Sequence, residues 1–124
     1  MRISHKEFED AVERALEMIP EMFRAQLNNM TIAVEDLPPR DLLREMDVPP
    51  GETLFGVFTG VPLPERSVTE PPLYPDVILI FREPLMAACH SYEELEEEIA
   101  ITVVHELAHY LGLSEERLEE LGYG

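Results

Sequence analysis

Two histidines and a glutamate lie close together near the end of the sequence, as His105, Glu106 and His109 in an H-E-x-x-H pattern. On a helix, residues four positions apart lie on the same face, so His105 and His109 can direct two imidazoles at one metal ion. Glu106 lies one position further round the helix. From there its carboxylate can contact a metal-bound water molecule, where a general base is required. The spacing therefore predicts a catalytic metal site.

A third metal ligand is expected a few residues later. Catalytic zinc usually has three protein ligands and one water molecule. Gly112 can adopt the left-handed conformation that ends a helix, which allows the chain to turn back and bring Glu115 toward the metal. Two imidazoles and one carboxylate form a known zinc ligand set, so we predict Zn2+ bound by His105, His109 and Glu115. The alternative interpretation is a buried amphipathic helix that carries two histidines without a metal.

The composition indicates a small and strongly acidic globular protein. Hydrophobic residues make up 45% of the 124 residues, which is enough for a core and favours one domain over residues 1–124. The 26 acidic residues outnumber the 9 basic ones, giving a net charge of −17. Because nucleic acids bind through clustered Lys and Arg, this charge argues against a nucleic-acid partner. It favours neutral or cationic substrates over anionic ones.

The cellular compartment is predicted from features that the sequence lacks. Cys89 is the one cysteine, which excludes an internal disulfide framework and suits a reducing environment. The N-terminal residues contain no apolar signal core, and the apolar runs are far shorter than the roughly 18 residues of a membrane span. We therefore expect a cytoplasmic protein that has no membrane partner.

Hydrophobic spacing predicts an α+β fold. Ser4 and Glu7 form a capping-box pattern ahead of an amphipathic helix, which should end or restart at Pro20. Apolar runs bounded by turn residues predict three strands. The strands are expected at 30–35, 54–59 and 76–81, and short helices at 20–28, 40–46, 84–88 and 115–121. The Pro-rich segment 60–75 is predicted to be a long surface loop, in which Arg66 is interpreted as solvated.

The motif is expected on a long helix between Ser91 and Gly112. Ser91 and Glu94 form a second capping-box pattern, and the residues from Ile99 onward are apolar nearly all round the helix. Such a helix should cross the core. We therefore expect a small three- to four-stranded sheet packed against this active-site helix and an N-terminal helix. The acidic run 93–98 is interpreted as a solvated face, and His90, just ahead of the helix, as structural or exposed.

The residues also resemble a known protein family. The segment from His105 to Glu115 resembles the active-site helix of the zincins, and its x-x-G-x-x extension resembles the metzincin form. The closer resemblance is to the small bacterial zincin-like metallopeptidases. It rests on Ile19-Pro20, Gly60-Val61-Pro62-Leu63, Ile101-Thr102-Val103-Val104-His105-Glu106 and Leu121-Gly122. Two features differ from true metzincins, because position 115 is Glu and no methionine follows His109 for a Met-turn.

This resemblance implies a zincin-like fold and a reaction class. It implies zinc held by His105, His109 and Glu115, with Glu106 as the catalytic base for hydrolysis of a peptide or protein substrate. The predicted strand 54–59 is our candidate for the edge that pairs with an extended peptide. Tyr110 and Tyr123 are candidates for stabilising the tetrahedral intermediate.

Two other functions remain open from the sequence. The first is a non-catalytic zinc-binding module, although such sites are usually closed by Cys ligands and have no use for Glu106. The second is a metal-dependent ribonuclease with the signature H-x-x-x-H-x-x-G-x-x-H. That signature lacks a Glu after the first His and ends in His where this chain has Glu115. The net charge of −17 also disfavours RNA binding.

Overall fold

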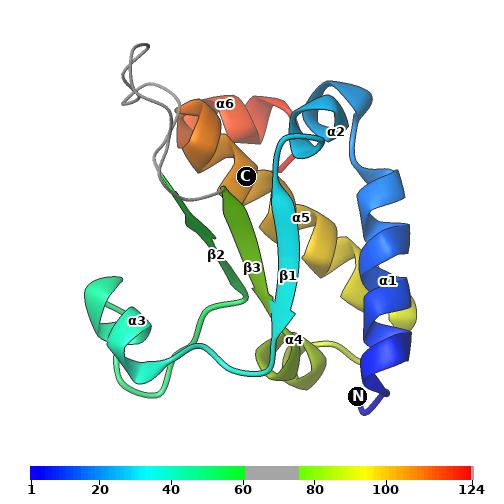
Figure 1. The fold of residues 1–124 in the computed structure, drawn as a ribbon, viewed down its shortest axis with the longest axis vertical. Coiled ribbons are helices and arrows are strands. Elements are labelled where there is room, and N and C mark those ends of the chain that lie inside the picture. The colour runs from blue at the N-terminus through cyan, green and yellow to red at the C-terminus, as the bar shows by residue number, and fades with distance from the viewer. Residues whose placement is uncertain (61–75, 124) are drawn as a thin grey trace.

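The computed structural model describes residues 1–60 and 76–123, so the predicted loop beyond Gly60, including Arg66, lies outside the described residues. In chain order the elements are α1 (His5–Met18), α2 (Glu21–Leu27), β1 (Thr31–Glu35), α3 (Arg40–Glu45), β2 (Gly56–Thr59), β3 (Val77–Phe81), α4 (Arg82–Ala88), α5 (Tyr92–Leu111) and α6 (Glu115–Glu120). Figure 1 shows their arrangement. The predicted α+β class is confirmed.

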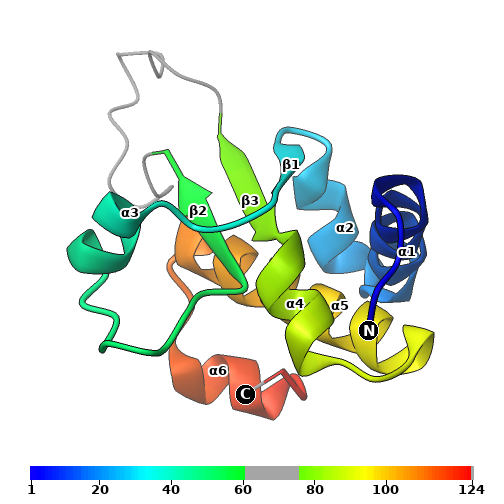
Figure 2. The ribbon, with the colours of Figure 1, turned by 90° about the horizontal axis from the view of Figure 1, so that it is seen from below.

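The described strands form one mixed sheet with the order β1-β3-β2. Strand β1 is parallel to β3, with Thr31 opposite Val77, and β2 is antiparallel to β3, with Gly56 opposite Ile80. The apolar strand β3 is therefore central, and β2 is an edge strand of the described sheet. Helix α5 contacts both β2 and β3, so the sheet packs against the motif helix (Figures 1 and 2).

Helix α1 starts with the predicted capping box. The Ser4 hydroxyl accepts a hydrogen bond from the Glu7 N–H at 3.1 Å, and the Glu7 carboxylate accepts one from the Ser4 N–H at 2.9 Å. These bonds satisfy two N–H groups that a helix start leaves without partners. Pro20 then separates the two helices, as predicted, and lies at the N-cap of α2. Helix α1 lies alongside α5 (Figure 1).

The hydrophobic core is centred on α5. The α5 side chains are buried on several sides of the helix, as the apolar residues predicted. They share one core cluster with α1, β3 and α4. Members of this cluster with at most 1% exposure include Phe8, Ala15, Ile78, Ile80, Leu85, Cys89, Leu95, Ile99, Val103, Val104 and Leu107. Burial of this much apolar surface stabilises the packing of the motif helix against the sheet. No helix within the described ranges is long and apolar enough to span a membrane.

The chain turns sharply after the motif helix. Gly112 has φ 73° and ψ 26°, the left-handed conformation predicted from its position. The Leu113 N–H then donates to the Ala108 carbonyl at 2.9 Å, which closes the end of α5. The Ser114 hydroxyl accepts a hydrogen bond from the Arg117 N–H at 3.1 Å and so caps α6. Helix α6 then buries Leu118 in the core cluster.

The start of α5 differs in one detail from the prediction. The Ser91 hydroxyl accepts a hydrogen bond from the Glu94 N–H at 3.1 Å, as expected. The Glu94 carboxylate, however, accepts its bond from the His90 N–H at 2.8 Å and not from Ser91. The second capping box is therefore only half formed, because the preceding residue supplies the backbone donor. His90 itself is exposed.

Two other boundaries lie away from their predicted positions. Strand β2 begins at Gly56, two residues after the predicted start, although the Phe55 carbonyl still accepts a bond from the Phe81 N–H at 2.8 Å. Helix α4 begins at Arg82 and not at Pro84, because it follows β3 directly. Pro84 fits there because the first turn of a helix has no need of its missing N–H.

Candidate metal centre

The motif residues lie in the C-terminal half of α5. The side chain of Glu106 is 14% exposed and that of His109 is 53% exposed, while His105 is half-buried. The Nδ1 atom of His109 lies 3.6 Å from Oε1 of Glu106. The structure thus places the two histidines one helical turn apart, as predicted, with the carboxylate of Glu106 beside the second one.

The Glu106 carboxylate is bound to the neighbouring strand. Its Oε1 atom accepts a hydrogen bond from the Phe58 N–H of β2 at 2.8 Å. The Phe58 ring also packs against the ring of Tyr110, with 5.6 Å between the centroids. Because backbone groups alternate along a strand, this N–H lies on the side of β2 that faces away from β3. Glu106 therefore joins α5 to the free edge of the described sheet.

The environment of Glu106 suits a group that accepts a proton. Burial raises the pKa of the Glu106 carboxyl above its ordinary value, because the charged form loses solvation. The Phe58 N–H and the imidazoles of His109 and His105 oppose this rise in pKa. The net pKa remains raised. A carboxylate with a raised pKa is a better match for proton transfer near neutral pH than an ordinary surface glutamate.

His105 is in contact with the C-terminal end of the described chain. Its Nε2 atom is hydrogen-bonded to the backbone carbonyl of Tyr123. The Tyr123 ring packs edge-on against Phe23 of α2, with 6.2 Å between the centroids and 84° between the ring planes. Since a carbonyl can only accept, Nε2 of His105 is the protonated nitrogen in this arrangement. A metal ion bound at this nitrogen would take the place of the carbonyl.

Glu115, the predicted third ligand, lies in the first turn of α6 and is exposed. Within residues 1–60 and 76–123, no three His, Cys, Asp or Glu side chains are grouped so that they could hold a metal ion. The structure places the Glu106 carboxylate beside His109, but it gathers neither His105 nor Glu115 with them into a group that could hold a metal ion. The donor chemistry of the two imidazoles fits zinc. The three-ligand set stays a prediction, and it requires the Glu115 side chain to move toward the histidines and His105 to exchange its contact with the Tyr123 carbonyl for the metal.

A groove of about 520 Å³ opens beside the motif. His105, Glu106 and Thr102 of α5 line one wall, and the segment from Gly51 to Gly56 lines the other. The groove therefore runs between the motif helix and the chain that leads into β2. This position makes the proposed catalytic carboxylate accessible to a bound chain, even though most of its side chain is buried.

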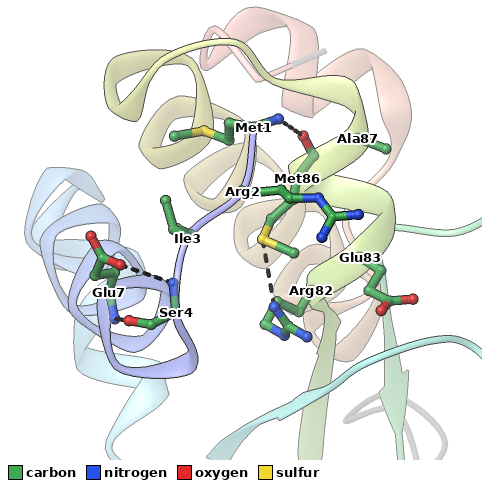
Figure 3. A pocket seen from close by; sticks show the side chains of 9 residues that line it. All are labelled: Met1, Arg2, Ile3, Ser4, Glu7, Arg82, Glu83, Met86 and Ala87. Carbon is green, nitrogen blue, oxygen red and sulfur yellow. Dashed lines mark hydrogen bonds between the residues drawn. The ribbon is translucent and has the colours of Figure 1, made fainter.

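Another cavity, of about 790 Å³, lies between the N-terminal residues and α4 (Figure 3). Two of its polar groups already have partners within the described chain. The N-terminal amine donates to the Met86 carbonyl at 2.7 Å, and Arg82 donates to the Asp36 carboxylate at 3.0 Å. The lining includes none of the motif residues. This cavity is therefore a less suitable candidate for the functional site.

The sequence did not reveal two backbone partners of the motif. The Phe58 N–H and the Tyr123 carbonyl contact Glu106 and His105, respectively, and backbone groups leave no residue-type pattern that could have identified them. Glu98, from the acidic run interpreted as a solvated face, also lines the groove beside the motif. The sequence could have indicated this, because Glu98 lies seven residues, or about two helical turns, before His105 and therefore on the same face of α5.

Comparison with known proteins identifies the family. A family model described as zincin-like metallopeptidase matches residues 27–124, and the chain therefore belongs to the zincin-like metallopeptidase family. The resemblance inferred from the motifs is thus confirmed, and so is the zincin-like fold. No curated protein matches the chain.

A solved structure supports the fold alone. A conserved hypothetical protein from Thermo thermophilus is 20% identical, with a TM-score of 0.53. The match covers 96% of this chain and 97% of that one. The similarity therefore extends over the whole architecture and not only over the motif helix.

Proposed function

We propose that this protein is a zinc-dependent metallopeptidase in which His105, His109 and Glu115 hold Zn2+ and Glu106 is the general base. The observation that carries the proposal is the position of Glu106, which is mostly buried beside the histidines of α5 and lines the groove. Family membership supports the same reaction class. Zinc would polarise the scissile carbonyl and lower the pKa of a bound water molecule.

Each motif side chain has a separate task in this proposal. The imidazoles of His105 and His109 supply neutral nitrogen ligands, and the Glu115 carboxylate supplies the third ligand. Glu106 takes a proton from the attacking water molecule and later donates it to the leaving amine. Its contact with the Phe58 N–H orients the carboxylate before the substrate arrives.

The free edge of β2 is the proposed position of the substrate backbone. The Phe55 carbonyl pairs with Phe81 of β3, so the backbone groups of Gly56 and Phe58 face away from β3. The Phe58 N–H is bonded to Glu106, so a peptide would pair with the other outward-facing groups of this edge. An extended peptide along this edge would lie next to Glu106 and His105, which line the groove. Backbone pairing of this kind holds a peptide regardless of its side chains.

A peptide digest tests the proposal against the non-catalytic alternative. Zinc-loaded wild-type protein and the Glu106→Gln variant would be incubated with a mixed peptide library, with products identified by mass spectrometry. We expect wild type to cleave peptides and Glu106→Gln to be slower by about 100-fold or more, with its zinc retained. His90→Ala, which changes an exposed histidine outside the motif, is the control and should cleave like wild type.

Two outcomes of this peptide digest would contradict the proposed function. Equal cleavage by wild type and Glu106→Gln would remove the assigned base. A zinc-loaded wild type that cleaves none of the peptides would favour a zinc-binding module without turnover.

A further inference from the structure

We infer that the groove beside the motif selects extended peptides that carry a basic side chain, Lys or Arg, about three residues from the scissile bond. This inference rests on the proposed function, because it assigns a substrate class to the same site. It starts from the shape of the groove. One wall is α5, and the other is the segment from Gly51 to Gly56, which continues into the edge strand β2.

The groove carries uncompensated negative charge. Glu52 from one wall and Glu98 from the other both line it. Neither carboxylate forms an ion pair with another residue of the described chain. The lining that the structure describes includes no Lys or Arg. A cationic side chain bound in this groove would therefore be attracted by both carboxylates without displacing an existing partner.

The negative charge extends beyond this groove along α5. A smaller cavity of about 190 Å³ shares Phe55 and Glu98 with the groove and is also lined by Glu94 and Glu97. Its described lining likewise contains no basic side chain. The two cavities are therefore neighbours along α5, with Glu106 and His105 lining the first and Glu94 and Glu97 lining the second.

The spacing of the helix sets the position of the basic residue. Glu98 precedes His105 by seven positions, which is about 10 Å along a helix axis. An extended peptide covers about 3.3 Å per residue, so a side chain opposite Glu98 belongs to a residue about three positions from the bond at the motif. Thr102 lies between them, and its hydroxyl is bonded to the Glu98 carbonyl at 2.8 Å. The wall of α5 at this intermediate position is therefore uncharged.

Binding without turnover tests this inference separately from peptidase activity. The full-length Glu106→Gln protein would be titrated with eight-residue peptides of Ala, Val and Thr that carry one Lys, scanned through the sequence. Matched peptides would carry Glu or Gln at the same position. Binding would be followed by NMR shifts of the Gly56 and Thr102 amides. We expect the best Lys peptide to bind at least about tenfold more tightly than its Glu counterpart at low salt.

Substitutions in the groove distinguish local recognition from the overall charge of the protein. Adding Glu52→Gln and Glu98→Gln should reduce the preference for Lys to about twofold. Adding Glu93→Gln instead removes one exposed carboxylate from the same helix and should retain the preference. Equal binding of Lys and Glu peptides would overturn the inference. So would a preference for Lys that persists in the double variant, because the net charge of −17 would then be its cause.

The result does not depend on cleavage. If Lys peptides bind in the groove but the zinc-loaded wild type cleaves nothing, the peptidase proposal fails and the groove assignment stands. If wild type cleaves peptides with no preference for a basic residue, the groove assignment fails and the peptidase proposal stands.

Discussion

The Glu106 carboxylate has two neighbours in this structure, a backbone N–H and an imidazole. The Phe58 N–H, at 2.8 Å, holds one carboxylate oxygen, and the His109 imidazole lies 3.6 Å from the same oxygen. A hydrogen bond from a backbone donor orients a side chain more strictly than packing does, because it restricts direction as well as distance. The carboxylate is thereby held at the groove while most of its side chain is out of solvent.

Hydrogen exchange tests the contact between Glu106 and β2. The Phe58 amide lies on the free edge of the described sheet, so its protection from exchange should depend on the Glu106 carboxylate. Glu106→Ala removes the acceptor, and the Phe58 amide should then exchange at a rate close to that of an exposed amide. Glu106→Gln keeps an acceptor oxygen and should keep most of the protection. Equal exchange in the two variants would show that the carboxylate does not hold this amide.

The stability of Glu106→Gln should depend on pH. Burial raises the pKa of Glu106 in the folded protein, so the folded state binds this proton at a pH where the unfolded chain has released it. Ionisation therefore lowers the stability of wild type above the folded pKa, and this loss disappears below the ordinary value of 4.5. In the zinc-free protein, we expect Glu106→Gln to be more stable than wild type near pH 7, with the difference shrinking toward about pH 4.

Urea denaturation at several pH values measures this difference. Glu116→Gln, at an exposed position, is the control for removing one carboxylate from an acidic protein. A Glu106→Gln variant that is less stable than wild type at neutral pH, by more than the control, would contradict a raised pKa at this position.

At the scale of elements, the close approach of β2 to α5 positions the site. A Cβ atom added to Gly56 would lie 2.6 Å from Cγ2 of Thr102 and 2.8 Å from the Leu79 carbonyl oxygen. Only glycine allows the strand to approach the helix this closely. Phe58, whose N–H contacts Glu106, lies two residues after Gly56 on β2. That contact therefore depends on the close approach of β2 to α5.

Gly56→Ala should therefore disturb both stability and the Glu106 contact. Overpacking of this kind typically costs about 1–3 kcal/mol of unfolding free energy. Thr102→Ser removes the nearest methyl group and keeps the hydroxyl, so adding it to Gly56→Ala should recover part of the loss. The Leu79 carbonyl cannot retreat as easily, so recovery should be incomplete. A Gly56→Ala protein with wild-type stability in chemical denaturation would show that β2 is free to move away from α5.

The elements themselves could be predicted from the sequence because their signals are local. Ser4 with Glu7, and Gly112 at the end of α5, mark their helix ends through side-chain caps and a left-handed glycine. The apolar run of β3 likewise indicated a strand. The exact partners at His90 and the start of α4 were missed, because neighbouring residues compete for the same backbone groups over one or two positions.

The site was only partly predictable, because local spacing determines some of its contacts and long-range packing determines the others. The spacing of His105 and His109 follows from helix geometry alone, and the structure keeps it. The approach of Glu115 depends on how α6 packs after the turn, and α6 is placed by burial of Leu118 in the core. Sequence spacing could not determine that packing. The contacts with Phe58 and Tyr123 join residues that are far apart in the chain, and no local pattern encodes them.

At the scale of the whole molecule, the N-terminal helix supports the motif helix from outside the family match. The family model covers residues 27–124, whereas α1 ends at Met18. Helix α1 nevertheless packs along α5 and forms two side-chain hydrogen bonds with it. Arg14 donates to Glu96 at 3.0 Å, and the Tyr92 hydroxyl donates to Glu7 at 2.8 Å. The position of the motif therefore depends on the complete fold and not on the matched segment alone.

The central claim is that the two histidines of α5 bind zinc together. Elemental analysis after zinc loading and extensive buffer exchange measures this directly, with wild type, His109→Ala and His90→Ala compared. We predict about one zinc ion per chain in wild type and in His90→Ala, and a large loss of zinc in His109→Ala. Equal zinc in wild type and His109→Ala would contradict the metal site proposed on α5.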